Sequence, residues 1–366
     1  MTRNIHVGLV VAALWLVPDS LGAQQPDHHA VAEGAFEPTL TMRGFSDVTF
    51  RGERFQPTTG PSETASTFGL GQFSFFLSAH IAENVSVVSE TAFVVGTDVR
   101  QSTSVILERI YVKYVLTDAV KIAVGRTHTA LGYWNEAYHH GALLHPTVAR
   151  PEILRFGGVM PVHSVGLEVS GRLPVRGWDI NYVGNLANGR ARDFSATQGA
   201  ADVNSSKAAA AKLSIAYESN RTVIFGPMIY HDVIPSDPTR PGRESEVTET
   251  IAGGHFVFRD PRFEFLSEYF KIRHVARATA MEVGHEGWYA IAIGRPWRSK
   301  PYVGIDVAQF TAGDEYFAGG DMSVRRYLAG IRYDVNPLNA LKFEYRHEHR
   351  AAGDTHALVI NTAFAF

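Results

Sequence analysis

The strongest constraint in this sequence is an alternation of apolar and polar residues with a period of two, which recurs from Pro38 to the last residue. In residues 341–350, for example, Leu341, Phe343 and Tyr345 alternate with an unbroken row of charged residues. Such alternation is typical of β-strands that are apolar on one face. No segment shows a sustained period of 3.6 residues, so the sequence predicts an all-β domain. A soluble sandwich and a transmembrane barrel both fit this pattern.

The connections between the predicted strands separate these two folds, because they alternate between short turns and long loops. The short turns, rich in Asn, Asp, Gly, Pro and Ser, lie near 82–84, 117–119, 174–177, 219–221, 260–261, 298–300 and 336–339. The long loops lie near 51–65, 96–103, 135–164, 186–207, 235–246, 274–281, 312–322 and 351–355. Outer-membrane barrels sort their connections in this way. We therefore predict an antiparallel up-and-down transmembrane β-barrel over residues 38–366, with about 16 strands (range about 14–18) and both ends in the periplasm.

Composition agrees with a barrel whose strands expose only every second residue to lipid. Hydrophobic residues make up 45% of the chain and the mean hydropathy is -0.07, and no apolar run after the N-terminus is long enough for a spanning helix. A barrel of about 16 strands is too wide for side chains to fill, so we expect a water-filled lumen with its charged face in solvent. The side chains predicted to face the lumen are Arg326, Arg332, Lys342, Glu344, Arg346, Glu348 and Arg350.

The N-terminus predicts export. Arg3 precedes an apolar core at 7–17, and Leu21-Gly22-Ala23 offers a cleavage site, so residues 1–23 are predicted to be a signal peptide and 24–37 a flexible leader. The chain has no cysteine, which excludes disulfides, thiolate metal sites, a cysteine nucleophile and a lipid-anchored cysteine. The predicted location is the outer membrane of a Gram-negative bacterium, reached through the periplasm.

The C-terminal strand, 355–366, places Phe364 and Phe366 on its apolar face. This ending resembles the C-terminal signature of bacterial outer-membrane barrels, in which a terminal aromatic residue follows alternating hydrophobic ones. The resemblance implies recognition by the barrel-assembly machinery and contact with outer-membrane lipid.

A second resemblance lies in residues 107–134, where Tyr111 and Tyr114 precede a short turn, then Gly125-Arg126 and Leu131-Gly132. This segment resembles porins of the phosphate-selective and general families. The resemblance implies a channel of about 16 strands, in families that are often homotrimers. The lysine-rich selectivity region of phosphate channels is missing, so phosphate specificity is not implied.

The longest predicted loop, 135–164, carries the densest set of functional groups. By analogy with general porins, in which the third external loop narrows the lumen, we interpret it as a pore constriction. Its candidate residues are Glu136, His139, His140, His145, Arg150, Glu152 and Arg155. Histidines lining the pore would make conductance depend on pH near 6–7. The alternatives are a surface loop packed on the barrel rim and, less favoured, a metal site of Glu136 with the three histidines.

The function predicted from the sequence is passive diffusion of small hydrophilic solutes or ions through an outer-membrane channel. The main alternative is a non-conducting barrel that acts as an adhesin, receptor or anchor through its outer loops. No nucleophile elbow or phosphate-binding loop occurs in the sequence, so we predict neither an enzyme nor a cofactor-binding protein. A net charge of -3 gives no basic field for nucleic acid, and no metal is predicted.

Overall fold

The computed structural model describes residues 36–94, 104–139, 141–148, 150–155, 158–194, 203–317 and 322–366. The chain divides into two units, Met1–Glu37 and Pro38–Phe366. The predicted signal peptide and residues 24–35 of the leader lie outside the described residues. In the part of the chain that is described, no helix is long and apolar enough to cross a bilayer.

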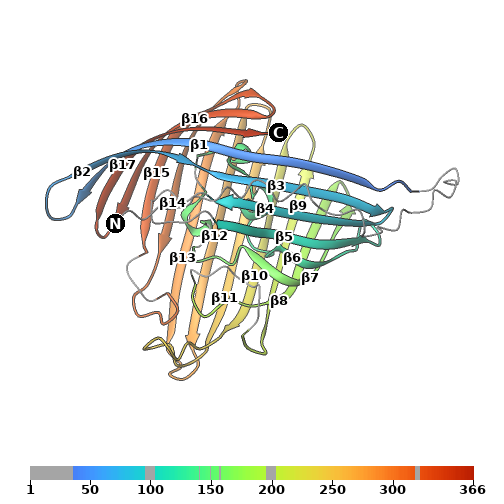
Figure 1. The fold of residues 1–366 in the computed structure, drawn as a ribbon, viewed down its shortest axis with the longest axis horizontal. Coiled ribbons are helices and arrows are strands. Elements are labelled where there is room, and N and C mark those ends of the chain that lie inside the picture. The colour runs from blue at the N-terminus through green and yellow to red at the C-terminus, as the bar shows by residue number, and fades with distance from the viewer. Residues whose placement is uncertain are drawn as a thin grey trace, which may run out of the picture. The chain divides into compact units, whose positions relative to one another are not determined.

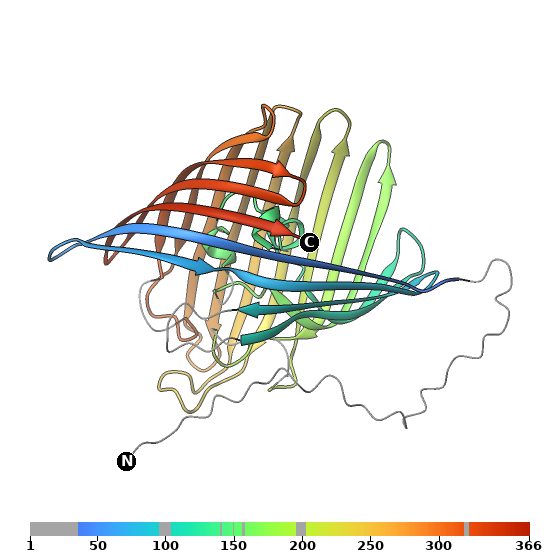
Figure 2. The same cartoon turned by 45° about the horizontal axis from the view of Figure 1, so that its top comes forward.

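The second unit is a single antiparallel sheet that closes on itself (Figures 1 and 2). Its strand segments are β1 (Thr39–Pro57), β2 (Glu63–Leu70), β3 (Gln72–Ala82), β4 (Val85–Val94), β5 (Ser104–Val115), β6 (Lys121–His128), β7 (His163–Val175), β8 (Trp178–Asn188), β9 (Lys207–Glu218), β10 (Thr222–Ile234), β11 (Val247–Arg259), β12 (Phe263–Ala276), β13 (Glu282–Gly294), β14 (Ser299–Gln309), β15 (Val324–Asn336), β16 (Asn339–Arg350) and β17 (Gly353–Ala365). Three short helical segments, α1 (Tyr133–Ala137), α2 (Gly141–Leu144) and the 3-10 turn η1 (Glu152–Leu154), lie between β6 and β7.

The barrel has 16 strands, because β2 and β3 are two segments of one strand. Both pair with β1, at Val48↔Leu70 and Phe45↔Ser74, and Gly71 interrupts the register between them. The other edge of β1 pairs with β17 and closes the sheet, as Figure 2 shows where the blue and red strands run together. The predicted fold class and strand number are therefore confirmed.

Three connections that the sequence predicts to be long are tight in the structure. The predicted loops 51–65, 274–281 and 351–355 shrink to 58–62, 277–281 and 351–352. Strand pairing continues past the alternating segments, as in β1 and β17, whose register runs out to Pro57↔Gly353. Polar residues at these strand ends weaken the apolar alternation, although the backbone groups there still pair.

Alternation separates the two faces of the barrel as predicted. On β15 and β16, Tyr327, Phe343 and Tyr345 are 44–48% exposed on the outer face, whereas Arg326, Lys342 and Glu344 are buried on the inner face. At the closing seam, Phe366 exchanges two backbone hydrogen bonds with Gly44 and its ring packs on Phe73 and Phe75. Phe364 and Phe366 lie on the outer face of this seam, and their role as an assembly signal stays a prediction.

Candidate functional site: the third loop inside the barrel

The connection 129–162 between β6 and β7 lies inside the barrel and reaches the far wall. The green helical turns of Figures 1 and 2 belong to this segment, hereafter the third loop. Gly132, with a φ of 80°, turns the chain from β6 into α1, a backbone conformation that favours glycine. The loop forms hydrogen bonds with inward side chains of β9, β12, β14, β15 and β16. It is therefore where the constriction hypothesis requires it, and the constriction role itself remains a prediction.

Three wall carboxylates on alternate strands accept hydrogen bonds from backbone N–H groups of the third loop. Glu268 on β12 accepts from Tyr133 N (2.5 Å) and Trp134 N (2.9 Å). Asp306 on β14 accepts from Glu152 N (2.7 Å), and Glu344 on β16 accepts from Val148 N (2.9 Å). The first N–H groups of a helix have no partner within the helix, and Glu268 supplies one for α1 from across the lumen.

Wall cations bind the loop's carbonyl groups in the same way. Arg332 donates to the carbonyl oxygens of Leu143 (2.6 Å) and His145 (2.8 Å), and Lys342 donates to those of Ala142 (2.5 Å) and Thr147 (3.0 Å). Positive charge thus meets the carbonyl end of α2, where it is electrostatically favourable. Because Lys342 and Glu344 are only 0% and 1% exposed, the expectation that this charged face lies in solvent is wrong for them.

Apolar packing fills part of the lumen between the loop and the wall. Trp134, Ile153 and Leu154 of the loop join one buried cluster with inward residues of the wall such as Leu266 and Phe270. The predicted lumen filled only by water is therefore wrong on this side. The physical reason is that a loop long enough to cross the barrel brings its own apolar side chains, which remove those of the wall from water.

The remaining inward charges of β15 and β16 form ion pairs. Arg326 contacts Asp306, Glu152 (3.3 Å) and Glu348 (3.6 Å), and Arg346 contacts Glu344. Arg350 lies 3.4 Å from Glu152 and 3.8 Å from Glu348. All seven charges predicted to face the lumen point inward, and most are matched by an opposite charge.

The predicted constriction residues do not form one ring. Glu136 pairs with Lys212 of β9 and keeps 57% of its side chain exposed, and Glu152 joins the Arg326 and Arg350 pairs. Arg155 is exposed and pairs with Glu152, whereas Arg150 is buried near the side-chain oxygen of Asn135. His140 lies outside the described residues.

The two described histidines of the prediction have different surroundings. His145 is buried against the ring of Trp134, and burial together with Lys342 and Arg150 holds its pKa well below the usual range. Both effects favour the neutral ring, and the pH dependence expected near neutrality stays a prediction. His139 instead lies beside His128 and His163, where the loop leaves and rejoins the wall.

A polar cavity of about 160 Å³ remains between the loop and the inner faces of β5 to β9. Its basic lining residues are Arg109, Lys113 and Lys212, and its acidic ones are Glu136 and Glu168. Sequence reasoning missed Lys212 and His128 as site residues. Lys212 is separated from Lys207 by four alanines, so no run of charges marks it. His128 acquires its partners only when the loop folds back.

Gly287 on β13 makes room for the loop, which leads to a test of its packing. A Cβ atom at Gly287 would lie 2.6 Å from Cγ1 of the buried Ile153. We expect Gly287→Val to push η1 away from the wall and to speed hydrogen exchange of the loop amides, measured by mass spectrometry. Gly284→Val on the same strand is the control, because a Cβ there meets only an oxygen at 3.9 Å. Equal exchange in both variants would contradict this packing.

The closed sheet of 16 strands with a long loop folded inside defines a porin-like transmembrane β-barrel. No protein-family model matches the sequence, and no curated protein is significantly similar to it. Among solved structures, the chain is similar to an anion-selective porin from Comamonas acidovorans, with a TM-score of 0.63 and 8% identity over 90% of this chain and 100% of the other.

Two further structures show the same likeness. OmpT of Vibrio cholerae in a trimer form gives a TM-score of 0.56 and 11% identity, over 90% of this chain and 99% of that one. OmpF of Salmonella typhi in complex with daunomycin gives 0.54 and 16%, over 89% and 97%. At these identities the likeness shows the fold, and the predicted resemblance to porin-like barrels is confirmed at that level.

Proposed function

We propose that this protein is an outer-membrane channel through which small hydrophilic solutes or ions diffuse passively. The observation that carries the proposal is the polar cavity beside the third loop, whose lining includes charges of both signs on a closed barrel wall. Charged groups at the narrowest part of a pore set its ion preference. In this proposal the Glu136–Lys212 pair borders the passage, and the hydrogen bonds from the wall fix the loop that narrows it.

The setting proposed for this channel is the outer membrane of a Gram-negative bacterium. Export would use the N-terminal segment 1–23, and assembly would use the C-terminal strand ending in Phe366. We propose a homotrimer, which is supported by the trimer form of the similar OmpT structure. We also propose that the protein is not an enzyme, since the charges around the loop are engaged in holding it rather than in a nucleophile–base pair.

A second candidate is a non-conducting barrel that acts through its outer loops as an adhesin, receptor or anchor. The apolar cluster around Trp134 inside the lumen favours it, because this cluster occupies space that an open pore would leave to water.

Single-channel recording of the refolded protein in a planar bilayer decides between the two candidates. We expect stepwise conductance that persists over time, because water and ions would cross beside the loop. Heat-modifiable gel mobility serves as the control for a folded barrel. A folded barrel without conductance steps would exclude the channel and leave the non-conducting barrel.

A further inference from the structure

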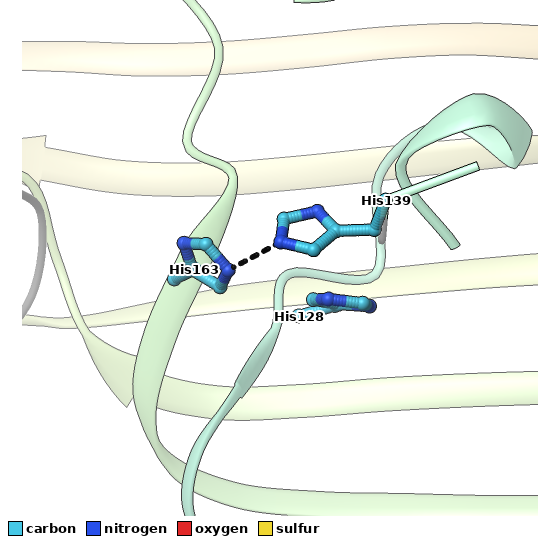
Figure 3. Close-up of side chains that lie close together, drawn as sticks. All are labelled: His128, His139 and His163. Atoms are coloured by element: carbon cyan, nitrogen blue, oxygen red, sulfur yellow. Dashed lines mark hydrogen bonds between the residues drawn. The ribbon is translucent and has the colours of Figure 1, made fainter. Parts of the chain in front are cut away.

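Three histidines converge where the third loop leaves and rejoins the wall. His128 ends β6, His163 begins β7 directly opposite it in the strand register, and His139 follows α1. Figure 3 shows the rings of His139 and His163 pointing at each other, with His128 beside them. One ring nitrogen from each residue lies within 4.8 Å of the other two, and Nε2 of His139 is 3.0 Å from Nε2 of His163.

Neighbouring groups contact the Nδ1 atoms of His139 and His163. The amide nitrogen of Asn135 donates to the carbonyl oxygen of Val162 (3.1 Å), so the amide oxygen faces Nδ1 of His139 at 3.2 Å. That oxygen can only accept, and Nδ1 of His139 is therefore the donor. A carboxyl oxygen of Glu108 lies 3.4 Å from Nδ1 of His163.

These two contacts engage the Nδ1 atoms, and the two Nε2 atoms face each other at 3.0 Å. A cation bound by both Nε2 atoms would take the place of the hydrogen bond between them. In a tetrahedral zinc site with Zn–N bonds of about 2.0–2.1 Å, two ligating nitrogens lie about 3.3 Å apart. The observed separation is close to this value, and the third histidine lies within reach.

We propose that His128, His139 and His163 bind a divalent transition metal of the zinc class. Imidazole suits Zn²⁺, Co²⁺, Ni²⁺ and Cu²⁺, and three histidine ligands leave one coordination position for water or solute. His128 also lines the polar cavity, so the open position faces the proposed passage. Glu108 and Asn135 contact Nδ1 of His163 and Nδ1 of His139 and so orient the two rings. Groups that contact metal ligands without touching the metal commonly have this role.

The charges around the site determine the metal affinity that we expect. Glu108 is the buried carboxyl group beside the site, and Glu90, Arg126, Arg150 and Arg109 are close enough to act on it electrostatically. Arg109 is itself paired with Glu90 at 2.9 Å. We therefore expect weaker binding than in a closed structural zinc centre, and further weakening at acidic pH, because the ligands must be neutral. The bound ion would join both ends of the loop to α1 and hold the loop in the lumen.

A second cluster of His274, His285 and Asp314 does not call for a metal. Asp314 binds His274 (2.6 Å) and His285 (2.9 Å), and His274 also binds Glu249 (2.9 Å). The backbone nitrogen of Thr311 donates to Nδ1 of His285 (3.1 Å). Every ring nitrogen of His274 and His285 thus has a hydrogen-bond partner, either a carboxylate oxygen or a backbone N–H group. A metal would have to break these hydrogen bonds.

Cobalt binding to the refolded, chelator-treated protein tests the proposal, because low-coordinate Co²⁺ with imidazole ligands absorbs visible light. We expect a saturable visible band that Zn²⁺ displaces. His139→Gln and His163→Gln should each abolish the band, and Glu108→Gln should weaken binding by about 10–100-fold. Heat-modifiable mobility confirms the fold of each variant. If the His163→Gln protein does not fold, the His139→Gln protein alone tests the proposal.

Two controls locate the site. His274→Gln removes the second cluster, and the double replacement of His28 and His29 removes the paired histidines of the leader; both should leave the band unchanged. The proposal is overturned if the unmodified protein gives no band. It is also overturned if either control loses the band. None of these results depends on whether the barrel conducts.

Discussion

Replacing Glu268, Asp306 and Glu344 together with alanine is expected to release the third loop from the wall and to raise the unit conductance several-fold. These carboxylates accept the backbone hydrogen bonds of Tyr133, Trp134, Glu152 and Val148. Each buried N–H group that loses its acceptor costs about 1–3 kcal/mol, so losing the acceptors of four such groups weakens the attachment of the loop to the wall. Single-channel recording before and after the replacement measures the effect.

The matched control removes carboxylates that do not touch the loop. Glu246 and Glu282 form exposed ion pairs with Arg277 and Arg273, and exposed pairs of this kind contribute little. The Glu246→Ala/Glu282→Ala protein should keep the original conductance. If the triple replacement also keeps it while the barrel stays folded, the wall carboxylates do not hold the constriction.

Trp134→Ala is expected to lower the free energy of unfolding by about 3–5 kcal/mol, the usual cost of removing a large aromatic side chain from a packed core. Trp134 is 0% exposed, and its ring packs within 5.0–5.7 Å of the rings of Tyr138, His145 and Tyr289. Urea titration of the refolded protein in lipid vesicles measures the change. The destabilisation is expected where the loop contacts the wall, because removing the indole ring leaves a cavity between them.

Trp297 supplies the control for this prediction. It is 74% exposed in the turn between β13 and β14, so Trp297→Ala should change the free energy of unfolding by less than about 1 kcal/mol. A similar loss in both variants would mean that tryptophan removal acts through lipid contact and not through the loop core.

The sequence predicts the barrel well because lipid imposes a local rule on it. Each strand must be apolar on its outer face and each backbone group must pair, so the alternation around Phe343 and Tyr345 shows in the residues themselves. Strand ends beyond the alternating segments do not need an apolar outer face, so the sequence does not reveal them. For this reason the long loops predicted at 51–65, 274–281 and 351–355 are short turns in the structure.

The site could be predicted only in part. The density of polar groups in 135–164 marks the loop as functional, and the inward direction of Lys342 and Glu344 follows from parity. Their partners lie almost 200 positions away in the chain, as with Lys342 and Thr147, and no local pattern encodes such a pairing. The pairing of His139 with His128 and His163, rather than with His145, likewise depends on the path of the loop.

The sequence by itself therefore determined the strand period, the positions of the short turns and the two faces of the wall, because each is a property of neighbouring residues. Only the tertiary structure decided that the lumen holds a folded loop, that wall charges bind its backbone instead of water, and that three histidines meet at its base. The first two features depend on closing the sheet, which brings groups from opposite walls within hydrogen-bond distance. The third depends on the loop folding back beside β6 and β7.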